Sequence, residues 1–348
     1  MIKVAIDVSP LSGQGSFRGV GFYTRILLES LEEQKELRVI EFKDGKIPPE
    51  ADLLHFPFFS PFSLSLPCTG KKKFVVTIHD LIPLIFPQHY PSGIKGKIKF
   101  AIQKARLKKV SMILTDSECS KKDIIKYLRF PSEKVEVVYL AAANRVKKIS
   151  DKQRLEEISK KFNLPPKFVL YVGDVNYNKN LVTLVKACQK IKIKLAMVGK
   201  KLGERDFDRG HIENRPLVEL NDLIAKGADV LKLGYVAEEE LAALYSLASV
   251  YCQPSLYEGF GLQILEAFAC GCPVVTSNIS SLPEIAGDAA VLVDPYKIDS
   301  IAVGMKSIME DRKLKDKMIQ AGFKQAQKFS WAKTVAETID IYKRCLGK

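Results

Sequence analysis

Two glutamates with seven residues between them, Glu258 and Glu266, stand on either side of a glycine-containing loop. The short run at 250–253, which begins Val-Tyr-Cys, is typical of a buried strand, and the Ala-rich apolar run at 262–270 is typical of a helix that ends at Gly271. This order places Glu258 in a strand-to-helix loop, beside glycines that allow a ligand to approach the backbone closely. It places Glu266 about one turn into the helix, near free N–H groups and a helix dipole that favour an anion.

Anion-binding amides next to two carboxylates suit a ligand that carries both phosphate and many hydroxyl groups, and a nucleotide-sugar is such a ligand. Two solvated acids beside an ordinary helix start would show the same spacing, so the spacing alone favours neither interpretation. A longer motif is needed to separate a ligand site from a plain helix start.

Such a motif covers residues 254–295. Residues 254–262 (Pro-Ser-Leu-Tyr-Glu-Gly-Phe-Gly-Leu) and 266–275 (Glu-Ala-Phe-Ala-Cys-Gly-Cys-Pro-Val-Val) resemble the Glu-x7-Glu signature of the retaining glycosyltransferases of family 4. The continuation at 282–295, with Leu-Pro-Glu-Ile and then Gly-Asp-Ala-Ala-Val-Leu-Val-Asp-Pro, resembles the same family. A match of this length is highly specific. One departure is Gln263, where many members carry proline; it lies between the two acids and need not change their chemistry.

The resemblance implies a retaining glycosyltransferase that moves a hexose from a nucleotide-diphosphate sugar to a glycan or a lipid-linked acceptor. Mannose or glucose on GDP or UDP is the expectation for the family, and the sequence identifies neither the base, the sugar nor the acceptor. By the same resemblance, Glu266 binds the ribose hydroxyls, and Glu258 holds the donor sugar at the catalytic centre. The loop between them also binds the donor, and it comprises Gly259, Phe260, Gly261 and Leu262.

Strand and helix patterns alternate along the whole chain, which favours α/β domains built on parallel sheets. We expect two Rossmann-like domains that face one another across a cleft, which is the GT-B fold that the resemblance also implies. At 348 residues the chain is long enough for two hydrophobic cores. Predicted strands lie near 3–8, 37–42, 52–56, 73–78, 111–116 and 135–138, and again near 168–172, 193–198, 229–233, 249–253, 273–276 and 290–293.

A charged segment at 149–167 ends in two prolines and predicts a domain boundary. We therefore expect an acceptor-side domain at 1–150 and a domain that binds the nucleotide-sugar donor at 165–330. The chain closes on three predicted helices. The last of them, at 331–346, is expected to cross back as it does in similar enzymes, so that residues 331–348 complete the first domain.

Ligands of open α/β sheets bind at the carboxyl ends of strands, so the loops that follow strands are candidate sites. Residues 12–23, after the first strand, are rich in glycine but lack the Gly-x-Gly-x-x-Gly spacing of dinucleotide sites, and a plain flexible turn explains them equally well. Their resemblance to the first loop of the family implies that Gly19 lies against the donor diphosphate, with Arg18 as a further positive charge.

A lone histidine after a strand is more often structural than catalytic, and His79 follows the predicted strand at 73–78. Its segment, Thr-Ile-His-Asp-Leu at 77–81, resembles a family pattern whose histidine reaches the transferred sugar. The resemblance therefore implies that His79 is catalytic. His55 resembles a second family position, which lines the acceptor cleft.

In the second domain, Lys179 stands where similar enzymes place a lysine on the donor diphosphate. Because a cation would neutralise the leaving nucleotide diphosphate, we expect Lys179 to act in catalysis. Many relatives carry an arginine directly after the glycine of this loop, but the present chain has Asp174, so Lys179 carries the charge alone or with Lys200. Residues 233–236, Leu-Gly-Tyr-Val, resemble the base-binding loop of the family, which makes Val236 a donor-binding residue.

We expect neither a metal nor a cofactor, since the nucleotide-sugar is a substrate. Asp206 and Asp208 form an Asp-x-Asp pair, the metal-chelating signature of the other glycosyltransferase architecture, but they lie in a charged segment, where acid pairs are common. The four histidines are scattered along the chain. The seven cysteines lack the spacing of a disulfide framework and are expected to be reduced.

Positive charge is concentrated in the first domain. The formal net charge is +14, and residues 1–150 contribute +10, from 25 Lys and Arg against 15 Asp and Glu. Seven of these cations and no acid lie at 95–109, on a predicted amphipathic helix over 94–109. This pattern favours an anionic lipid surface and an ordinary solvated face about equally. With no run of roughly 20 apolar residues and no secretory signal pattern, we expect a cytoplasmic protein, peripheral on the inner membrane face under the first interpretation.

Two other classes of protein stay open. A nucleotide-sugar epimerase can share the architecture of two facing sheets, and product analysis without an acceptor would identify it. A basic nucleic-acid-binding protein would explain the charge, but it leaves the two-glutamate motif unexplained, and the lysine clusters lack stacking aromatics. The expected partners are therefore a nucleotide-sugar and a glycan or lipid-linked acceptor, and no nucleic acid.

Overall fold

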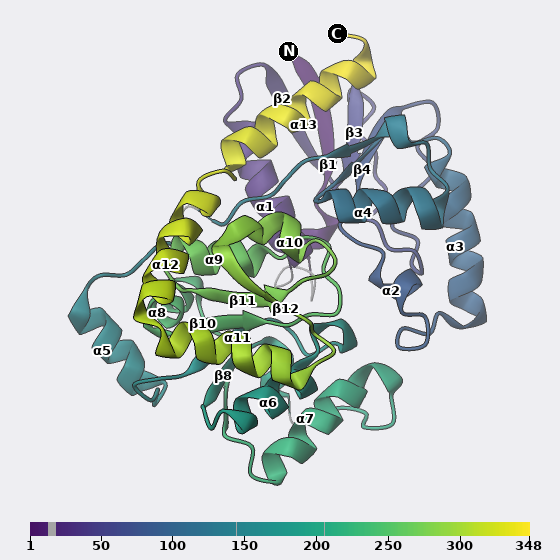
Figure 1. The fold of residues 1–348 in the computed structure, drawn as a ribbon. Helices are drawn as coiled ribbons and strands as arrows, with labels where there is room; N and C mark the ends of the chain where they lie inside the picture. Colours follow the sequence, from purple (N-terminus) through teal and green to yellow (C-terminus); the bar gives the residue numbers. More distant parts are fainter. Residues whose placement is uncertain (13–18, 144, 205) are drawn as a thin grey trace. The chain divides into compact units, whose positions relative to one another are not determined.

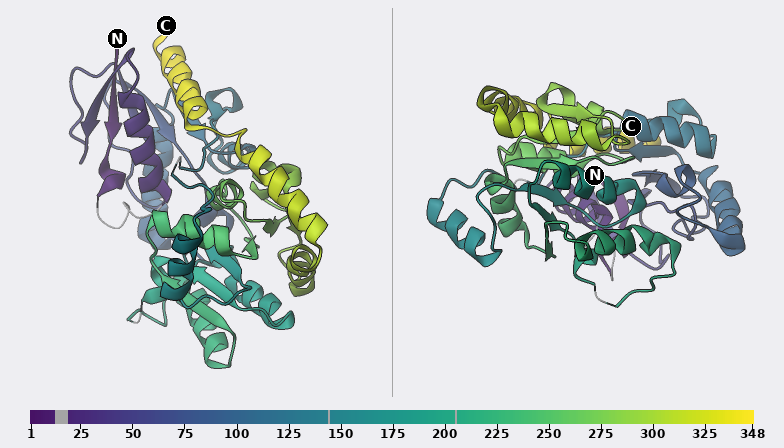
Figure 2. Two further views of the ribbon diagram at one scale, coloured as in Figure 1. Left: turned by 90° about the vertical axis from the view of Figure 1, so that its left-hand side faces the viewer. Right: turned by 60° about the horizontal axis from the view of Figure 1, so that its bottom comes forward.

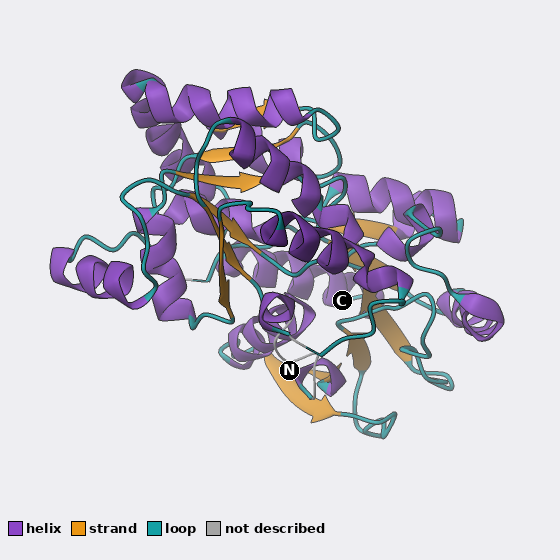
Figure 3. Cartoon of the chain, turned by 90° about the horizontal axis from the view of Figure 1, so that it is seen from below, coloured by secondary structure: helices purple, strands orange, loops and turns teal. Residues whose placement is uncertain are grey.

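The computed structural model describes residues 1–12, 19–143, 145–204 and 206–348. This part of the chain divides into two compact units. Unit 1 comprises Met1–Leu140 and Phe329–Lys348, and unit 2 comprises Ala141–Lys328. In each unit the strands lie between helices, as expected for α/β folds (Figure 3).

Among the described residues, the sheet of unit 1 contains β1 (Ile2–Asp7), β2 (Leu37–Phe42), β3 (Leu53–Phe56), β4 (Lys73–Thr77), β5 (Met112–Thr115) and β6 (Val135–Val137). These strands pair in parallel in the order β2-β1-β3-β4-β5-β6, and Figure 1 labels β1 to β4. β3 is buried at every position, which explains why its sequence, apolar except for His55, shows no alternation.

The described helices of unit 1 are α1 (Gly19–Glu32), α2 (Ile82–Ile85), α3 (Gly93–Leu107), α4 (Glu118–Asp123) and α13 (Trp331–Leu346). α13 contacts α1, β4 and β5, so the last helix of the chain packs on the N-terminal elements (Figure 2). It buries Trp331, Val335, Ile339 and Tyr342, which recur at helical spacing along one stripe. The prediction of a helix at 331–346 that crosses back is therefore confirmed.

The described strands of unit 2 are β7 (Val169–Val172), β8 (Leu195–Val198), β9 (Val230–Gly234), β10 (Val250–Gln253), β11 (Val274–Ser277) and β12 (Ala290–Val293). They pair in parallel in the order β12-β11-β10-β7-β8-β9. Parallel strands need crossover connections, and in unit 2 helices alternate with the strands to provide them.

The described helices of unit 2 are α5 (Lys152–Lys161), α6 (Leu181–Lys190), α7 (Arg215–Ala225), α8 (Glu238–Leu247), α9 (Leu262–Ala269), α10 (Leu282–Ala286), α11 (Ile298–Glu310) and α12 (Arg312–Ala326). α6, α7 and α11 bury Leu184, Leu220 and Met305 in one apolar cluster with Val169 and Met197 of the sheet. α9 packs on β10 and β11, and α8 and α12 pack on α9.

The two parallel sheets with their helices confirm the predicted α/β fold class. Every predicted strand lies within two residues of an observed one. The match follows from burial, because the inner strands of α/β units are mostly apolar, as in β8, which is buried at every residue.

Candidate functional site

The strand order of unit 2 reverses between β7 and β10, since β8 and β9 lie on one side of this pair and β11 and β12 on the other. Ligands of open α/β sheets bind at such a reversal, outside the carboxyl ends of the strands. The two loops at this point are residues 173–180, after β7, and residues 254–261, after β10. They contain Lys179 and Glu258, which the sequence predicts to act in catalysis.

Lys179 and Glu258 form an ion pair that joins the two loops. Nζ of Lys179 donates to Oε1 and to Oε2 of Glu258, at 2.8 Å each. The two side chains are only 16% and 8% exposed. Nε2 of Gln253 and Oγ of Ser255 also donate to Oε1 of Glu258, at 2.9 and 2.6 Å. Gln253 and Ser255 therefore hold the carboxylate of Glu258. This carboxylate in turn fixes the positive charge of Lys179 at the point where the strand order reverses.

The residues on either side of this lysine also bind the second loop, and no role was predicted for them. Nδ2 of Asn178 donates to the carbonyl oxygen of Tyr257 at 2.9 Å, and Nδ2 of Asn180 donates to that of Pro254 at 3.0 Å. Asn180 has φ +59°, in the left-handed region that asparagine tolerates. An Asn-Lys-Asn run shortly after a strand is the available sequence signal, because asparagine favours turns and binds backbone groups.

Residues 259–262, predicted to bind the donor, form the turn that leads into α9. Gly259, Phe260 and Gly261 are buried, and Leu262 is the partly exposed first residue of the helix. Gly261 has φ +101°, and a Cβ at this position would lie 2.9 Å from Cδ2 of Leu282. Glycine is therefore required for the helix to begin directly after the loop of Glu258, which is the arrangement expected of an anion site.

Glu266, on α9, is partly exposed, and its Oε2 accepts a hydrogen bond from the OH of Tyr245, on α8, at 2.9 Å. The pKa of Glu266 is raised to about 7, and burial is the main cause. The hydrogen bond from Tyr245 opposes this rise, and the charge of Glu238 adds to it. Near neutral pH the carboxyl group is therefore divided between its neutral and its ionised form.

This titration predicts a pH dependence of donor binding. Only the ionised form of Glu266 offers both oxygens as acceptors to ribose hydroxyls. Because the pKa lies at about 7, affinity for the donor is expected to rise about tenfold between pH 6 and pH 8. Calorimetry with a nucleotide-sugar measures this, and its diphosphate stays fully ionised over this range.

Tyr245→Phe provides the control for this prediction. It removes the hydrogen bond that lowers the pKa of Glu266, so the rise in affinity should move to higher pH. A dissociation constant that is the same at pH 6 and pH 8 would contradict a contact between Glu266 and the ribose.

The other predicted donor-binding residues lie at other strand ends. Val236 is buried in the loop after β9. Gly19 is the exposed first residue of α1 in unit 1, and a Cβ at this position would meet no described atom within 4 Å, so packing does not require the glycine. The predicted contact of Arg18 lies outside the described residues. Asp174 is partly exposed after β7, and its backbone carbonyl accepts a hydrogen bond from the OH of Tyr171 at 3.0 Å.

In unit 1, His79 follows β4, and Asp116 follows the neighbouring strand β5. Nδ1 of His79 lies 2.6 Å from Oδ2 of Asp116, and Nε2 lies 3.1 Å from the carbonyl oxygen of Pro57. The ring of Tyr23, on α1, packs edge-on against the imidazole, with ring centroids 4.7 Å apart. The side chain of His79 is 15% exposed, so part of the ring reaches solvent. No role was predicted for Asp116 from the sequence.

His55 does not line a cleft, and this prediction is wrong. The side chain is fully buried in β3, where Nδ1 lies 2.6 Å from the OH of Tyr342, on α13, and Nε2 lies 2.8 Å from Oγ1 of Thr77. Burial, and to a smaller degree the charge of His79, lower the pKa of His55 to about 3, so the ring stays neutral. His55 is a structural residue that ties α13 to the sheet.

The described residues contain no group of three or more His, Cys, Asp or Glu side chains that could hold a metal ion. Asp206 and Asp208 are both exposed, and Oδ1 of Asp208 accepts a hydrogen bond from the backbone N–H of Gly210 at 2.8 Å. This is the ordinary structure of a polar loop. No helix in the described part of the chain has the length and apolar character that crossing a bilayer requires.

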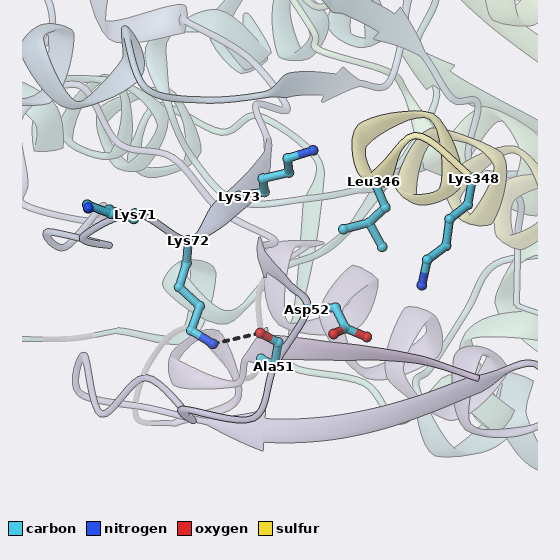
Figure 4. A pocket seen from close by; sticks show the side chains of 7 residues that line it. All are labelled: Ala51, Asp52, Lys71, Lys72, Lys73, Leu346 and Lys348. Carbon is cyan, nitrogen blue, oxygen red and sulfur yellow. Dashed lines mark hydrogen bonds between the residues drawn. The ribbon is translucent and has the colours of Figure 1, made fainter.

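A cavity of about 520 Å³ lies at the opposite end of the unit 1 sheet, where Lys73 begins β4 (Figure 4). Nζ of Lys72 donates to the carbonyl oxygen of Ala51 at 2.7 Å, and Nζ of Lys73 donates to that of Cys345, near the end of α13, at 2.9 Å. A cation at the C-terminus of a helix interacts favourably with its dipole. We therefore attribute Lys73 to the packing of α13 and Lys72 to the packing of the loop before β3.

Comparison with known families covers most of the chain. Residues 19–141 match the family described as Glycosyltransferase Family 4, and residues 152–325 match the one described as Glycosyl transferases group 1. The chain is 31% identical to the O-antigen chain mannosyltransferase B of Escherichia coli, over 78% of this chain and 70% of the relative. The chain belongs to glycosyltransferase family 4. It is therefore a glycosyltransferase, in a family of retaining hexosyltransferases.

Other relatives and a solved structure are also similar to this chain. The O-antigen chain mannosyltransferase RfbU of Salmonella typhimurium is 30% identical over 69% of this chain and 65% of its own length. The serotype-specific mannosyltransferase WbdA of Escherichia coli is 26% identical over 82% of this chain, which spans about a third (35%) of that relative. The structure of sucrose-phosphate synthase from Thermosynechococcus elongatus superposes with a TM-score of 0.77 at 20% identity, over 100% of both chains. Because this identity is low, the superposition supports the fold alone, and it confirms the predicted GT-B type.

Proposed function

We propose that this family 4 enzyme transfers mannose or glucose from a nucleotide-diphosphate sugar, with retention, to a glycan or lipid-linked acceptor in polysaccharide synthesis. The observation that carries the proposal is the Lys179–Glu258 ion pair beside the start of α9, at the reversal of the strand order. It fixes a cation at the place where a diphosphate is expected to bind and depart. The relatives named as O-antigen mannosyltransferases support mannose as the sugar and a polysaccharide as the acceptor.

In this proposal, unit 2 binds the donor, and its functional part lies within residues 165–330. Lys179 and the N–H groups at the start of α9 stabilise the charge that develops on the departing diphosphate. Glu266 accepts hydrogen bonds from the ribose, and Val236 lies against the base. Glu258 holds Lys179 and also contacts the donor sugar.

Unit 1 supplies the acceptor side, within residues 1–150 and 331–348. Gly19 allows the diphosphate to approach the backbone of α1, and His79 contacts the transferred sugar. Retention follows when the acceptor attacks the face from which the phosphate departs, so no dedicated general base is required. Lys179 takes the place of a metal ion in neutralising the diphosphate, and the reaction needs no cofactor.

The melting temperature of the purified protein with UDP, GDP, ADP and CMP, first without metal and then with magnesium, tests the donor site. A ligand that binds only the folded state stabilises it by about 2.7 kcal/mol at a hundredfold excess over its dissociation constant. We expect a rise with one nucleoside diphosphate, of the same size with and without magnesium, and this ligand names the donor base. No rise with any nucleotide, or a rise only with magnesium, would contradict the proposal.

One helix of unit 1 supports a membrane as an additional partner. The side of α3 that faces the unit is formed by Gly96, Gln103 and Leu107, which are buried. Its outer side carries three isoleucines, spaced four residues apart and therefore aligned in one stripe. These are Ile94, Ile98 and Ile102, which are 80%, 58% and 38% exposed.

An apolar stripe in solvent is unusual for a globular protein and marks an interaction surface. Exposed lysines flank the stripe, at positions 95, 97, 99, 108 and 109. We propose that this surface rests on an anionic bilayer, with the isoleucines at the headgroup boundary and the lysines on lipid phosphates. The enzyme would then act from the cytoplasm on the inner membrane face, where a lipid-linked acceptor is within reach.

A further inference from the structure

The ring of His79 is held so that both of its nitrogens face hydrogen-bond acceptors. The carbonyl oxygen of Pro57, 3.1 Å from Nε2, can only accept, so Nε2 carries a proton. Nδ1 lies 2.6 Å from Oδ2 of Asp116, whose side chain is 5% exposed. An ionised carboxylate also only accepts, which places a second proton on Nδ1. The geometry is that of an imidazolium paired with a carboxylate.

The charges around the ring favour the same state. Burial by itself lowers the pKa of His79, but the charge of Asp116 and its hydrogen bond outweigh burial and raise the pKa, with a further contribution from Asp80. Two further titratable groups near the ring, His55 and Tyr23, are neutral. His55, on β3, has a lowered pKa, and burial raises the pKa of Tyr23, on α1.

Residues 115–120, from the end of β5 into α4, hold His79 at several points. Asp116 binds the ring, and Oγ of Ser120, on α4, donates to the backbone carbonyl of His79 at 2.9 Å. Oγ1 of Thr115 donates to the carbonyl oxygen of Ile78 at 2.7 Å. One short segment therefore fixes the ring, its own backbone and the preceding peptide, as expected of residues that position a functional group.

We propose that Asp116 is a positioning residue that keeps His79 doubly protonated, so that His79 serves the reaction as a hydrogen-bond donor and not as a base. The proposal rests on the proposed contact between His79 and the transferred sugar. The Nε2–H now faces the carbonyl oxygen of Pro57. In the complex, a sugar hydroxyl or a phosphate oxygen of the donor would accept this hydrogen bond instead. A ring with two protons cannot accept the proton of the acceptor hydroxyl, so that proton passes to the departing diphosphate, which gains the electron pair of the broken glycosidic bond.

¹⁵N NMR of the full chain labelled at histidine tests the protonation of the ring. The chain has four histidines, and His79→Gln identifies the signals of His79. At pH 7 we expect two protonated ring nitrogens in the wild type. Asp116→Asn is expected to lower the proton affinity of the ring about tenfold or more, which leaves it neutral at pH 8. Asp80→Asn, which removes a nearby carboxylate that contributes less than Asp116 to the raised pKa of His79, should have a smaller effect.

A wild-type ring with one protonated nitrogen at pH 7, or an Asp116→Asn ring that titrates like the wild type, would overturn the proposal. If Asp116→Asn does not fold, the wild-type spectrum alone decides. The pH profile of kcat/KM is a second readout, since Asp116→Asn should lose activity at high pH and keep it at low pH, whereas purely structural damage lowers activity at every pH. Full turnover in His79→Gln would remove His79 from the proposed reaction and leave the NMR result unchanged, so the two failures are distinguishable.

Discussion

Lys179→Ala is expected to lower kcat by about 10²- to 10³-fold, because it removes the cation proposed to stabilise the departing diphosphate. Binding of the intact donor should weaken less than turnover, since the charge on the leaving oxygen develops only in the transition state. Release of nucleoside diphosphate measures kcat and KM, and calorimetry measures donor binding. Equal losses of turnover and of donor affinity would contradict a role in the transition state.

The same substitution also leaves Glu258 as a buried carboxylate without its cation, which lowers the free energy of unfolding by about 3–5 kcal/mol. Loss of turnover must therefore be separated from unfolding. The double variant Lys179→Met/Glu258→Gln replaces the pair by neutral side chains of similar shape. It should regain most of the melting temperature and remain inactive. A double variant that regains turnover would show that Lys179 serves only to neutralise Glu258.

Ile98→Asp in α3 is expected to weaken binding to anionic vesicles about 10- to 100-fold, because it removes about 1.5–3 kcal/mol of apolar burial in the bilayer. The variant should keep its melting temperature, since the side chain of Ile98 is 58% exposed. Co-sedimentation with vesicles at low salt measures the affinity. Ile212→Asp is the matched control, because Ile212 is an isoleucine of unit 2 that is 39% exposed and should leave vesicle binding unchanged.

The charge of the same surface supplies the second arm of this test. Replacing Lys95, Lys97 and Lys99 by glutamine should cost about 1 kcal/mol of membrane affinity per lysine at low salt, and less as salt is added. Vesicles of neutral lipid should bind the wild type weakly. If the wild type ignores anionic vesicles at low salt, the membrane proposal fails.

The positions of the strands were predictable because the sheets are parallel and buried. β8 is buried at every residue and its apolar run marks it in the sequence, and β3 is equally buried and apolar except for His55. The same property explains the error at His55. Neighbouring side chains of a strand point to opposite faces, but when both faces are buried the sequence does not show which face a given residue takes.

The pairing of Lys179 with Glu258 was not predictable, although both residues were identified. They lie 79 positions apart, and they meet because β7 and β10 are neighbours. Asp116 meets His79 for the same reason, since β5 lies beside β4. Local periodicity specifies where strands occur and leaves their order in the sheet open. Each partner was therefore visible in the sequence only as a polar residue after a strand.

The direction of the apolar stripe on α3 was also not predictable. Helical spacing identifies Ile94, Ile98 and Ile102 as one stripe, and an amphipathic helix ordinarily turns such a stripe toward the core. Here Gly96 and Gln103 face the unit, and the amide of Gln103 donates to Oγ of Ser65 at 2.7 Å. A glycine and a glutamine give no hydrophobic signal, so the sequence does not show that these two residues form the side of α3 that faces the unit.

The place of α13 in unit 1 has a consequence for synthesis on the ribosome. The sheet of unit 1 is translated first, but the helix that buries Trp331 and Tyr342 against it emerges after all of unit 2. At about 5–20 residues per second the delay is roughly 10–40 s. During this time the imidazole of His55 lacks its contact with Tyr342, whereas unit 2 is one continuous segment. The second unit in the sequence is thus the first that can fold to completion.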